Sequence, residues 1–339
     1  MHGPCDHPGP RAHQRPSSVL AYGVPGLVQA SQGHELLIEP CAPFRLDLTA
    51  WALRRRAHNT LDRWHESTYQ RVVSIGGGPV ALSVAQHDAL DGPRLSVLLT
   101  GRPIDQRVEL LARDVLNKLL GLTVDLSGFT AMAERDPLLG PIAERMRGVK
   151  PPRFPSIFEA LVNGVACQQL SLAVGIHLLN RLTQAHGRPV SEDPDGPRAF
   201  PDPEQLATIQ PEQLKLHGFS LSKARTIVET AQAIVAGDLD LEALEQLDDL
   251  AAIECLRSLR GIGRWTAEYV MLRGLGRLHI YPGDDVGAHN KLKRLFDIDT
   301  KLDYDTVQEL VSCWQPYAGM VYFHLLLQSL SETGLLSEA

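Results

Sequence analysis

Two adjacent carboxylates open a helical pattern late in the chain. Gly283 is followed by Asp284 and Asp285, and the apolar spacing from Val286 to Phe296 predicts a helix directly afterwards. A carboxylate fixed there can stabilise a positive charge that develops on a substrate, or orient and deprotonate a water molecule. Capping of the helix is the simpler explanation for an aspartate at this position, and it is compatible with catalysis.

A pair of glycines separates two further helical patterns. An apolar run from Leu256 to Leu259 leads into Gly261, Ile262 and Gly263, and a new helical pattern begins at Arg264. Glycine permits a tight turn and a close backbone approach. The free N–H groups at the start of a helix form a ready site for a phosphate. The pattern predicts a rigid phosphate-binding hairpin with Ile262 between its helices; a plain helix–helix corner is the alternative.

Trp265 and Tyr269 lie four residues apart and therefore share one face of the helix that begins at Arg264. Aromatic faces can receive a flat ring, and they attract a cation by about 0.5–2 kcal/mol. Packing of both rings in a buried core is the alternative. The carboxylate twenty residues after Trp265, Asp285, favours a binding pocket over that alternative.

Two motifs carry a resemblance to a known family. Gly-Ile-Gly-Arg-Trp-Thr-Ala at residues 261–267 and Pro-Gly-Asp-Asp at residues 282–285 resemble the 3-methyladenine DNA glycosylase II branch of the helix–hairpin–helix DNA glycosylase superfamily. The resemblance covers residues 44–332. It implies an enzyme that flips an alkylated base out of duplex DNA, hydrolyses its N-glycosidic bond and leaves an abasic site.

The resemblance implies roles for individual side chains. Asp285, the second aspartate, matches the catalytic carboxylate that stabilises the sugar cation and activates water. Bifunctional relatives carry a nucleophilic lysine at the position of Trp265, so we expect a monofunctional enzyme that uses water. The expected base pocket consists of Trp265, Tyr269, Tyr281 and Leu326. Relatives often have an aromatic residue where Leu326 stands, so the breadth of the substrate range stays open.

The hairpin has two further functions in the family. Its amides near Gly261, Gly263, Arg264 and Trp265 would bind a DNA phosphate. Its carbonyls, which map to Arg257, Leu259 and Ile262, would hold a structural monovalent cation, Na⁺ or K⁺.

Gln168-Gln169-Leu170-Ser171 resembles the family's Gln-Gln-Val-Ser step. Relatives insert a side chain from this step into the gap that the flipped nucleotide leaves. Gln169 matches that wedge, and Leu170 is the alternative. Lys223 and Arg225 on a later helix could add phosphate contacts, although a solvated surface charge is the simpler explanation for each.

Charge is distributed unevenly along the 339 residues. The formal net charge of −7 excludes a protein that is basic throughout. Residues 256–296 nevertheless contain eight Lys and Arg against three acids, whereas residues 237–255 contain acids and no Lys or Arg. This asymmetry suggests that one face binds DNA and another faces water.

The cysteines indicate reduced thiols rather than a cluster or a disulfide framework. Cys5, Cys41, Cys167, Cys255 and Cys313 are scattered and odd in number. We expect no iron–sulfur cluster, because the clustered C-terminal cysteines of the iron–sulfur glycosylases are missing, and no required cofactor. No apolar run reaches the length of a membrane helix. We expect a monomer in the bacterial cytoplasm, associated with the nucleoid.

Hydrophobic patterns divide the chain into three parts. Residues 1–39 are rich in Pro, Gly and His and predict a disordered tail. Residues 40–148 predict a small α+β domain, an antiparallel sheet with helices, and residues 149–335 predict an all-α domain after a Pro-rich boundary. The resemblance makes the second part the flank and the third part the helix–hairpin–helix catalytic domain.

The individual elements follow from apolar spacing. Strands are expected at Phe44–Leu48, Tyr69–Ile75, Val80–Ala85 and Leu95–Thr100, with a hairpin turn at Gly76–Gly78. Helices are expected at Ala50–Glu66, Ile104–Leu122, Ala131–Met146, Ser156–Gln169, Leu172–Ala185, Pro203–Leu206, Pro211–Leu214, Ser222–Ala236, Ala243–Ala252, Tyr304–Cys313 and Gly319–Leu330.

Three other functions compete with this interpretation. One is a non-catalytic helix–hairpin–helix protein that binds DNA, although such a protein needs no carboxylate beside a sugar. Another is a glycosylase for a different damaged base, such as oxidised guanine or hypoxanthine. The last is a helical scaffold in which the hairpin, the aspartate and the aromatic pair are coincidences.

Overall fold

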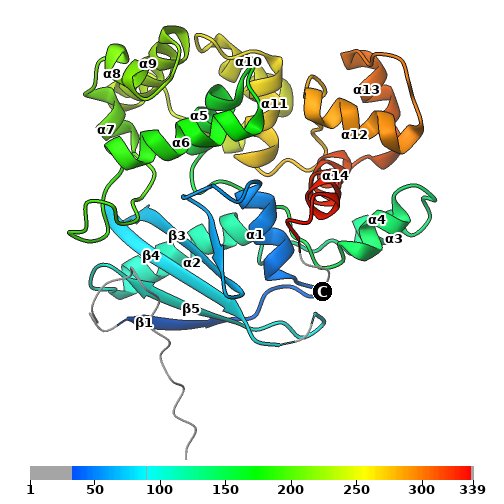
Figure 1. Cartoon of the computed structure of the whole chain (residues 1–339), viewed down its shortest axis with the longest axis horizontal. Coiled ribbons are helices and arrows are strands. Elements are labelled where there is room, and N and C mark those ends of the chain that lie inside the picture. The colour runs from blue at the N-terminus through cyan, green and yellow to red at the C-terminus, as the bar shows by residue number, and fades with distance from the viewer. Residues whose placement is uncertain (1–32, 89, 337–339) are drawn as a thin grey trace, which may run out of the picture.

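The chain forms an α+β layer with a set of helices above it in the computed structural model, which describes residues 33–88 and 90–336 (Figure 1). The layer contains a five-stranded antiparallel sheet in the order β1-β5-β4-β3-β2. Its strands are β1 (His34–Ile38), β2 (Arg63–His65), β3 (Thr68–Ile75), β4 (Gly78–Gln86) and β5 (Leu95–Thr100). Helices α1 (Leu46–Arg54) and α2 (Gln106–Leu120) share one buried apolar cluster with the sheet. The expected α+β class is confirmed.

The central hairpin follows the sequence pattern closely. Val80, Leu82 and Val84 alternate along β4, and all three are buried against the helices. Gly76 and Gly77 connect β3 to β4 with φ angles of 56° and 80°, which glycine adopts without strain. The predicted turn at the triple glycine is confirmed.

The segment before β3 differs from the prediction. We expected a strand at Phe44–Leu48 and a single helix at Ala50–Glu66, but α1 begins at Leu46 and the chain turns at Arg55, whose φ is 58°. An arginine rather than a glycine occupies the left-handed C-cap of α1, so the usual sequence signal of a helix end is missing. Trp64, expected on a helix, lies on strand β2.

The predicted tail is wrong in its last residues. Residues 1–32 lie outside the part of the chain that the structure describes. His34–Ile38, in contrast, forms strand β1 at the edge of the sheet, where Leu36 pairs with Val97 and is 4% exposed. A strand of five residues depends on its partner strand, and β5 lies some sixty positions later in the chain.

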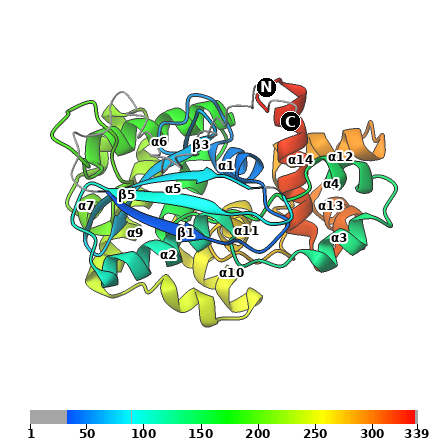
Figure 2. The ribbon, with the colours of Figure 1, turned by 90° about the horizontal axis from the view of Figure 1, so that it is seen from below.

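Two short helices replace the single helix expected at Ala131–Met146. They are α3 (Ser127–Ala133) and α4 (Gly140–Arg145). Pro137 separates them because it cannot continue a helix, and the carboxylate of Asp136 accepts the N–H groups that follow. Both helices lie beside α13 and α14 when the molecule is seen from below (Figure 2).

Helices dominate the remainder of the chain. They are α5 (Ile157–Cys167), α6 (Leu172–His186), α7 (Pro203–Ala207), α8 (Pro211–Leu216), α9 (Leu221–Ala236), α10 (Asp249–Ser258), α11 (Arg264–Arg273), α12 (Val286–Phe296), α13 (Tyr304–Val311) and α14 (Ala318–Glu332), with 3-10 turns at Glu242–Gln246 and Ser312–Trp314. The helix expected at Ala243–Ala252 is instead a 3-10 turn followed by the start of α10, because Asp248 caps α10 through the Ala251 N–H. In the described residues, no helix is long and apolar enough to cross a membrane.

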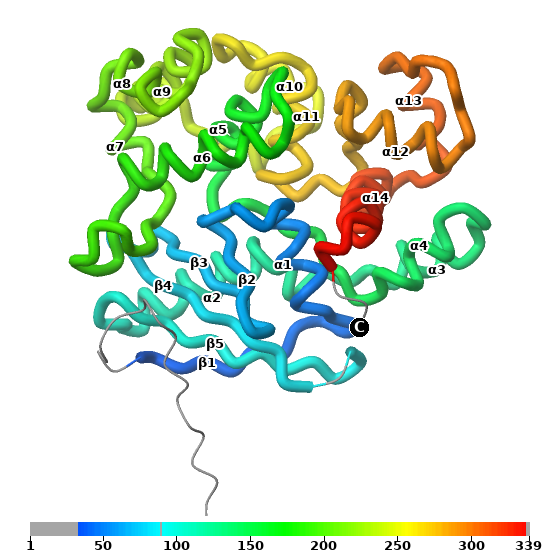
Figure 3. Tube along the Cα trace, viewed as in Figure 1, coloured from blue at the N-terminus to red at the C-terminus, as the bar shows by residue number. Residues whose placement is uncertain are grey.

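Two hydrophobic clusters fill the helical part. One is formed by α5 to α11, and the other by α12, α13 and α14 together with α3, α4 and part of α1. The chain crosses from the first cluster to the second between α11 and α12, where the tube in Figure 3 changes from yellow to orange. The segment that carries Asp284 and Asp285 therefore lies where the two clusters meet.

A buried ionic cluster joins the sheet to the helices. Arg71 on β3 donates to Asp62 Oδ1 at 2.6 Å and to Glu159 on α5, and the Tyr69 hydroxyl donates to Asp62 at 2.7 Å. Arg71 is 1% exposed. Burial by itself raises the pKa of Asp62, but Arg71 and Tyr69 outweigh it and hold that pKa below its usual value. The cluster fixes the sheet layer against α5.

Candidate active site

The turn between α10 and α11 has the geometry expected of a hairpin. Gly261 has a φ of 75°, and a Cβ there would collide with Thr226 Oγ1 on α9. Ile262 is 5% exposed and packs into the cluster of α5 to α11, as predicted. A Cβ at Gly263 would meet no atom within 4 Å, so the start of α11 faces open space. Among the residues described, no side chain caps the first N–H groups of α11, as a phosphate site at a helix start requires.

Gln168 fastens this hairpin to the loop between α5 and α6. Its Nε2 donates to the Gly261 carbonyl and to Thr266 Oγ1, both at 2.9 Å. Gln169 was the predicted residue of this step, and Gln168 was not predicted. Two adjacent glutamines do not reveal which amide turns inward, because both lie beyond the helix that would fix their direction.

The two candidate wedge residues protrude from the same loop. Gln169 is exposed and has a φ of 54°, a conformation that costs a non-glycine residue free energy. Leu170 is 44% exposed. Apolar side chains that stand out from a DNA-binding surface are suited to insertion between bases. The choice between Gln169 and Leu170 stays a prediction.

Lys223 supports the fold in this structure. Its Nζ donates to the carbonyls of Ala166 at 3.0 Å and Gln168 at 2.7 Å, so it satisfies the C-terminal end of α5. Burial lowers the pKa of Lys223. Arg225, which we paired with it as a possible phosphate contact, is exposed.

The carbonyls expected to hold a monovalent cation lie at the end of α10 and in the hairpin. Arg257 belongs to the last turn of α10, where carbonyls lack intrahelical donors. The Leu259 carbonyl accepts the Ile262 N–H at 3.1 Å and retains its second lone pair. Backbone oxygens suit a hard cation such as Na⁺ or K⁺, so this donor set fits. In the described residues, no three His, Cys, Asp or Glu side chains form a metal-binding group.

Asp285 caps α12 and also faces two aromatic donors. Its Oδ1 accepts from the Ala288 N–H at 2.8 Å. Its Oδ2 accepts from Trp265 Nε1 at 3.2 Å and from the Tyr322 hydroxyl at 3.1 Å. Three donors from α11, α12 and α14 thus hold the carboxylate in one orientation. Such preorganisation is what electrostatic stabilisation of a developing charge requires.

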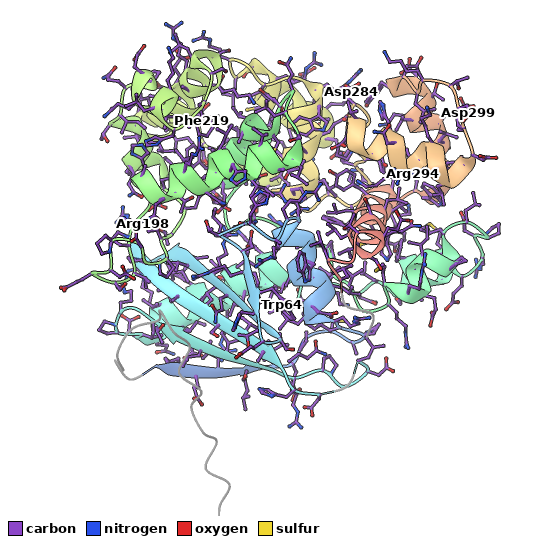
Figure 4. All side chains as sticks on the ribbon, viewed as in Figure 1. Trp64, Arg198, Phe219, Asp284, Arg294 and Asp299 are labelled. Atoms are coloured by element: carbon purple, nitrogen blue, oxygen red, sulfur yellow. The ribbon has the colours of Figure 1, made fainter. Side chains whose placement is uncertain are left out.

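Asp284 is bound quite differently from its neighbour. Arg264 donates to both of its oxygens, through Nε at 2.8 Å and Nη2 at 3.1 Å, and the guanidinium lies 3.5 Å from the ring centroid of Tyr304. Figure 4 shows Asp284 where α11 approaches α12. Asp284 therefore fastens the loop to α11, and Arg264 is engaged in this pair.

Glu268 on α11 binds the backbone of the loop that carries Asp284 and Asp285. It is 4% exposed, and its carboxylate accepts the Gly283 N–H at 3.0 Å and the Tyr304 hydroxyl at 2.6 Å. Burial raises the pKa of Glu268. Glu268 was not among the predicted site residues, and its only signal in the sequence was an acid on a largely apolar helix.

Trp265 and Tyr269 stack with 5.4 Å between ring centroids and 28° between ring planes. The Tyr269 hydroxyl donates to Asn163 Oδ1 and accepts from Arg55 Nη1, both at 2.9 Å. Trp265 is partly exposed, whereas Tyr269 is 3% exposed. We refer to Trp265 and Tyr269 as the aromatic wall; it stands beside Asp285.

The other two expected pocket residues lie in the core. Tyr281 and Leu326 are 2% and 8% exposed and belong to the cluster of the C-terminal helices. Tyr322, one turn before Leu326 on α14, bonds to Asp285 in their place, with Tyr281 edge-on behind it at 5.8 Å. Burial and the Asp285 carboxylate raise the pKa of Tyr322 well above its usual value, so it remains a hydrogen-bond donor. Leu326 and Tyr322 lie one turn apart on the same face of α14, and the pocket roles of Tyr281 and Leu326 stay predictions.

Comparisons with known proteins agree with this geometry. Residues 162–316 match the family model of the HhH-GPD superfamily base excision DNA repair protein. The chain is 28% identical over 286 residues to DNA-3-methyladenine glycosylase of Bacillus subtilis, which covers 83% of this chain and 93% of that protein. It is 27% identical over 187 residues to DNA-3-methyladenine glycosylase 2 of Escherichia coli, with 55% of this chain and 63% of that protein covered.

A solved structure shows the same fold over a longer stretch. The 3-methyladenine DNA glycosylase from Archaeoglobus fulgidus superposes with a TM-score of 0.75 at 24% identity, covering 86% of this chain and 97% of that one. This coverage includes the sheet layer as well as the helices. The residues that match the family model contain Gln168, the hairpin and Asp285. Residues 162–316 are therefore identified as a domain of the HhH-GPD superfamily of base excision DNA repair proteins.

Proposed function

We propose that this chain is a monofunctional DNA glycosylase of base excision repair that removes alkylated bases of the 3-methyladenine and 7-methylguanine type. One observation carries the proposal: Asp285 is held by three donors directly beside the aromatic wall. The names of its relatives among the alkylation-repair glycosylases support the substrate class.

The aromatic wall supplies the binding part of the reaction. A damaged base must leave the helical stack before an enzyme can reach its glycosidic bond. The open start of α11 would hold the backbone, and Gln169 or Leu170, both exposed, would fill the gap left in the duplex. The base would then stack against the partly exposed face of Trp265. An alkylated purine is cationic, and the π face attracts that charge.

Asp285 supplies the chemical part. As the C1′–N bond breaks, its electron pair leaves with the base, and positive charge develops on the sugar. The fixed carboxylate stabilises this charge. Water then attacks C1′, and Asp285 accepts the proton that the water loses. A cationic base is already a good leaving group, so the reaction requires no strong general acid.

The decisive experiment measures base release from methylated duplex DNA by wild type and by Asp285→Asn, with abasic sites scored separately from nicks. We expect methylpurine release by wild type and loss in the variant by about 10²–10³-fold, with DNA binding retained, because one preorganised electrostatic group is removed. Binding without release by wild type would favour a non-catalytic DNA-binding protein.

Strand cleavage is a second candidate activity, and one contact favours testing it. Trp265 stands where bifunctional relatives carry a lysine, but Lys291 on α12 is near the carboxylate. A Cβ at Gly287 would lie 3.1 Å from Asp285 Oδ1 and 3.9 Å from Lys291 Nζ. Burial lowers the pKa of Lys291, which favours a nucleophilic amine. Borohydride trapping of a covalent complex that Lys291→Ala abolishes would replace the monofunctional proposal; no trapping is expected.

We also propose that the protein acts as a cytoplasmic monomer on duplex DNA and requires no redox cofactor or iron–sulfur cluster. The partners that the site calls for are a DNA backbone at the hairpin and a flipped base at the aromatic wall. Light scattering behind size exclusion, with and without duplex, tests the monomer. Base release that is unchanged by a chelator of transition metals tests the absence of a required cluster.

A further inference from the structure

Arg55 reaches the aromatic wall from the sheet layer. It follows α1 and lies 214 positions before Tyr269, yet its Nη1 donates to the Tyr269 hydroxyl at 2.9 Å. Its Nε donates to the Leu53 carbonyl at 3.2 Å, and the whole residue is 4% exposed. The chain adopts a left-handed conformation there, with a φ of 58°, which is unusual for arginine. The fold therefore holds this guanidinium in place at a conformational cost.

The guanidinium brings a positive charge to this position without a direct ion pair to any described residue. In the described part of the chain, its hydrogen bonds go to a carbonyl and a phenol, and no carboxylate lies within ion-pair distance of it. Asp62, the carboxylate whose field reaches it, is already bonded to Arg71. Burial by itself lowers the pKa of Arg55, but its neighbours Tyr269 and Asp62 hold that pKa above its usual value. Arg55 is therefore charged at every pH at which the protein would work.

A second guanidinium lies close by. Arg273 is fully buried on α11 and donates to the Ala52 carbonyl at 3.1 Å. The guanidinium carbons of Arg55 and Arg273 lie 5.7 Å and 5.0 Å from the ring centroid of Phe154. Two positive charges thus lie on the Tyr269 side of the aromatic wall, which we call its back. Asp285 bonds to Trp265 on the other side, the front.

We propose that Arg55 is a specificity-determining positioning residue, whose charge behind Tyr269 weakens the preference of the pocket for cationic bases over neutral ones. A hydrogen bond from a cation draws electron density out of the phenol ring, and the same charge repels a cationic base directly. A neutral damaged base, such as hypoxanthine, experiences neither effect to the same degree. The inference rests on the proposed function and deepens it, because it assigns part of the substrate selection to the sheet layer.

The test is a ratio of two excision rates. Enzyme in excess is reacted with duplexes that differ only in one base, 7-methylguanine or hypoxanthine. Arg55→Gln removes the charge but keeps a donor for the Tyr269 hydroxyl, and Arg55→Lys keeps the charge. Arg54→Gln is the matched control, since Arg54 ends the same helix and donates to the carbonyls of Asp62 and Ala57 rather than to the aromatic wall.

We expect Arg55→Gln to raise the rate ratio of 7-methylguanine to hypoxanthine by about threefold to tenfold, as removal of one nearby charge from a partly desolvated site implies. Arg55→Lys and Arg54→Gln should stay within about twofold of wild type. Proportional loss of both rates in Arg55→Gln, with an unchanged ratio, would show that Arg55 is merely structural and would overturn the inference. Release of neither base by wild type would instead contradict the proposed function.

Two substitute measurements cover variants that fold poorly and bases that are released slowly. If Arg55→Gln does not fold, Tyr269→Phe removes the hydroxyl through which the guanidinium polarises the ring. The ratio should then rise by less than in Arg55→Gln, because the direct repulsion remains. If wild type releases one base too slowly to time, binding replaces rates. The ratio of the dissociation constants of the two duplexes is then compared between Asp285→Asn and the double variant Asp285→Asn, Arg55→Gln. An unchanged ratio in either measurement overturns the inference.

Discussion

The front of the aromatic wall and its back are built in different ways. In front, Trp265 and Tyr322 donate to Asp285, a carboxylate that is partly open to solvent. Behind, Arg55 and Asn163 hold the hydroxyl of Tyr269 in a fully buried setting. Polar groups that face a substrate can change the reaction rate without much change in stability. Buried polar groups lose their partners when substituted, so changes behind the wall should alter stability first.

The largest effect on stability is expected at Arg71, in the buried ionic cluster between the sheet and α5. Arg71→Met leaves Asp62 and Glu159 buried without their cation, and we expect the free energy of unfolding to fall by about 3–5 kcal/mol. Urea denaturation measures the change. Arg102→Met is the control, because Arg102 bonds to turn carbonyls and should cost about 1 kcal/mol or less. A loss at Arg71 no larger than at Arg102 would contradict the expectation that buried polar groups contribute more to stability than exposed ones.

The next effect is a pH dependence of the free energy of unfolding, and it arises from His324 on α14. His324 is 1% exposed, and burial lowers its pKa to about 4 against an opposing hydrogen bond to the Met320 carbonyl. The unfolded chain binds the proton more readily, so the contribution of neutral His324 is full above pH 6.5 and is lost as the pH falls towards 4. The loss should reach about 3 kcal/mol over that window.

Urea midpoints at pH 7.5 and 4.5 test this dependence. His324→Gln should flatten the difference between the two, because glutamine does not titrate. Equal pH dependence in wild type and variant would mean that other groups control acid stability. Tyr322, two residues earlier on the same helix, should not contribute to the pH dependence of stability over this range.

A front residue should behave in the opposite way. Tyr322→Phe removes one donor to Asp285 Oδ2, and we expect base release to slow by about tenfold with little change in stability. Tyr281→Phe is the matched control, since the Tyr281 hydroxyl has no hydrogen-bond partner in the described structure. Single-turnover rates compare the two variants. Equal rates for both would mean that Tyr322 does not act on the carboxylate.

The smallest effect is expected at Asp284. Its pair with Arg264 is more than one-third exposed, so Asp284→Asn should cost about 1 kcal/mol of stability or less and leave base release within about threefold. Thermal unfolding and single-turnover kinetics check both values. If this variant lost as much activity as Asp285→Asn, the two aspartates would have to exchange roles.

Local rules explain why parts of the site could be predicted. The glycine hairpin and α12 depend on residues a few positions apart: Gly261 requires a left-handed turn, and an aspartate before Val286 caps the helix. The strand and helix expected at Phe44–Leu48 and Ala50–Glu66 were wrong for a related reason. Helix α1 ends before Arg55, a left-handed C-cap that lacks the glycine by which a helix end is usually predicted.

The sequence by itself determined the hairpin, the carboxylate at the start of α12 and the aromatic pair on α11, because each depends on short-range geometry. The tertiary structure alone decided that Tyr322 bonds to Asp285, that Asp284 pairs with Arg264, and that Arg55 bonds to Tyr269. Those contacts join elements from both hydrophobic clusters and the sheet layer. Their partners are set by how whole helices pack, and helix packing is fixed by the shape of the complete core.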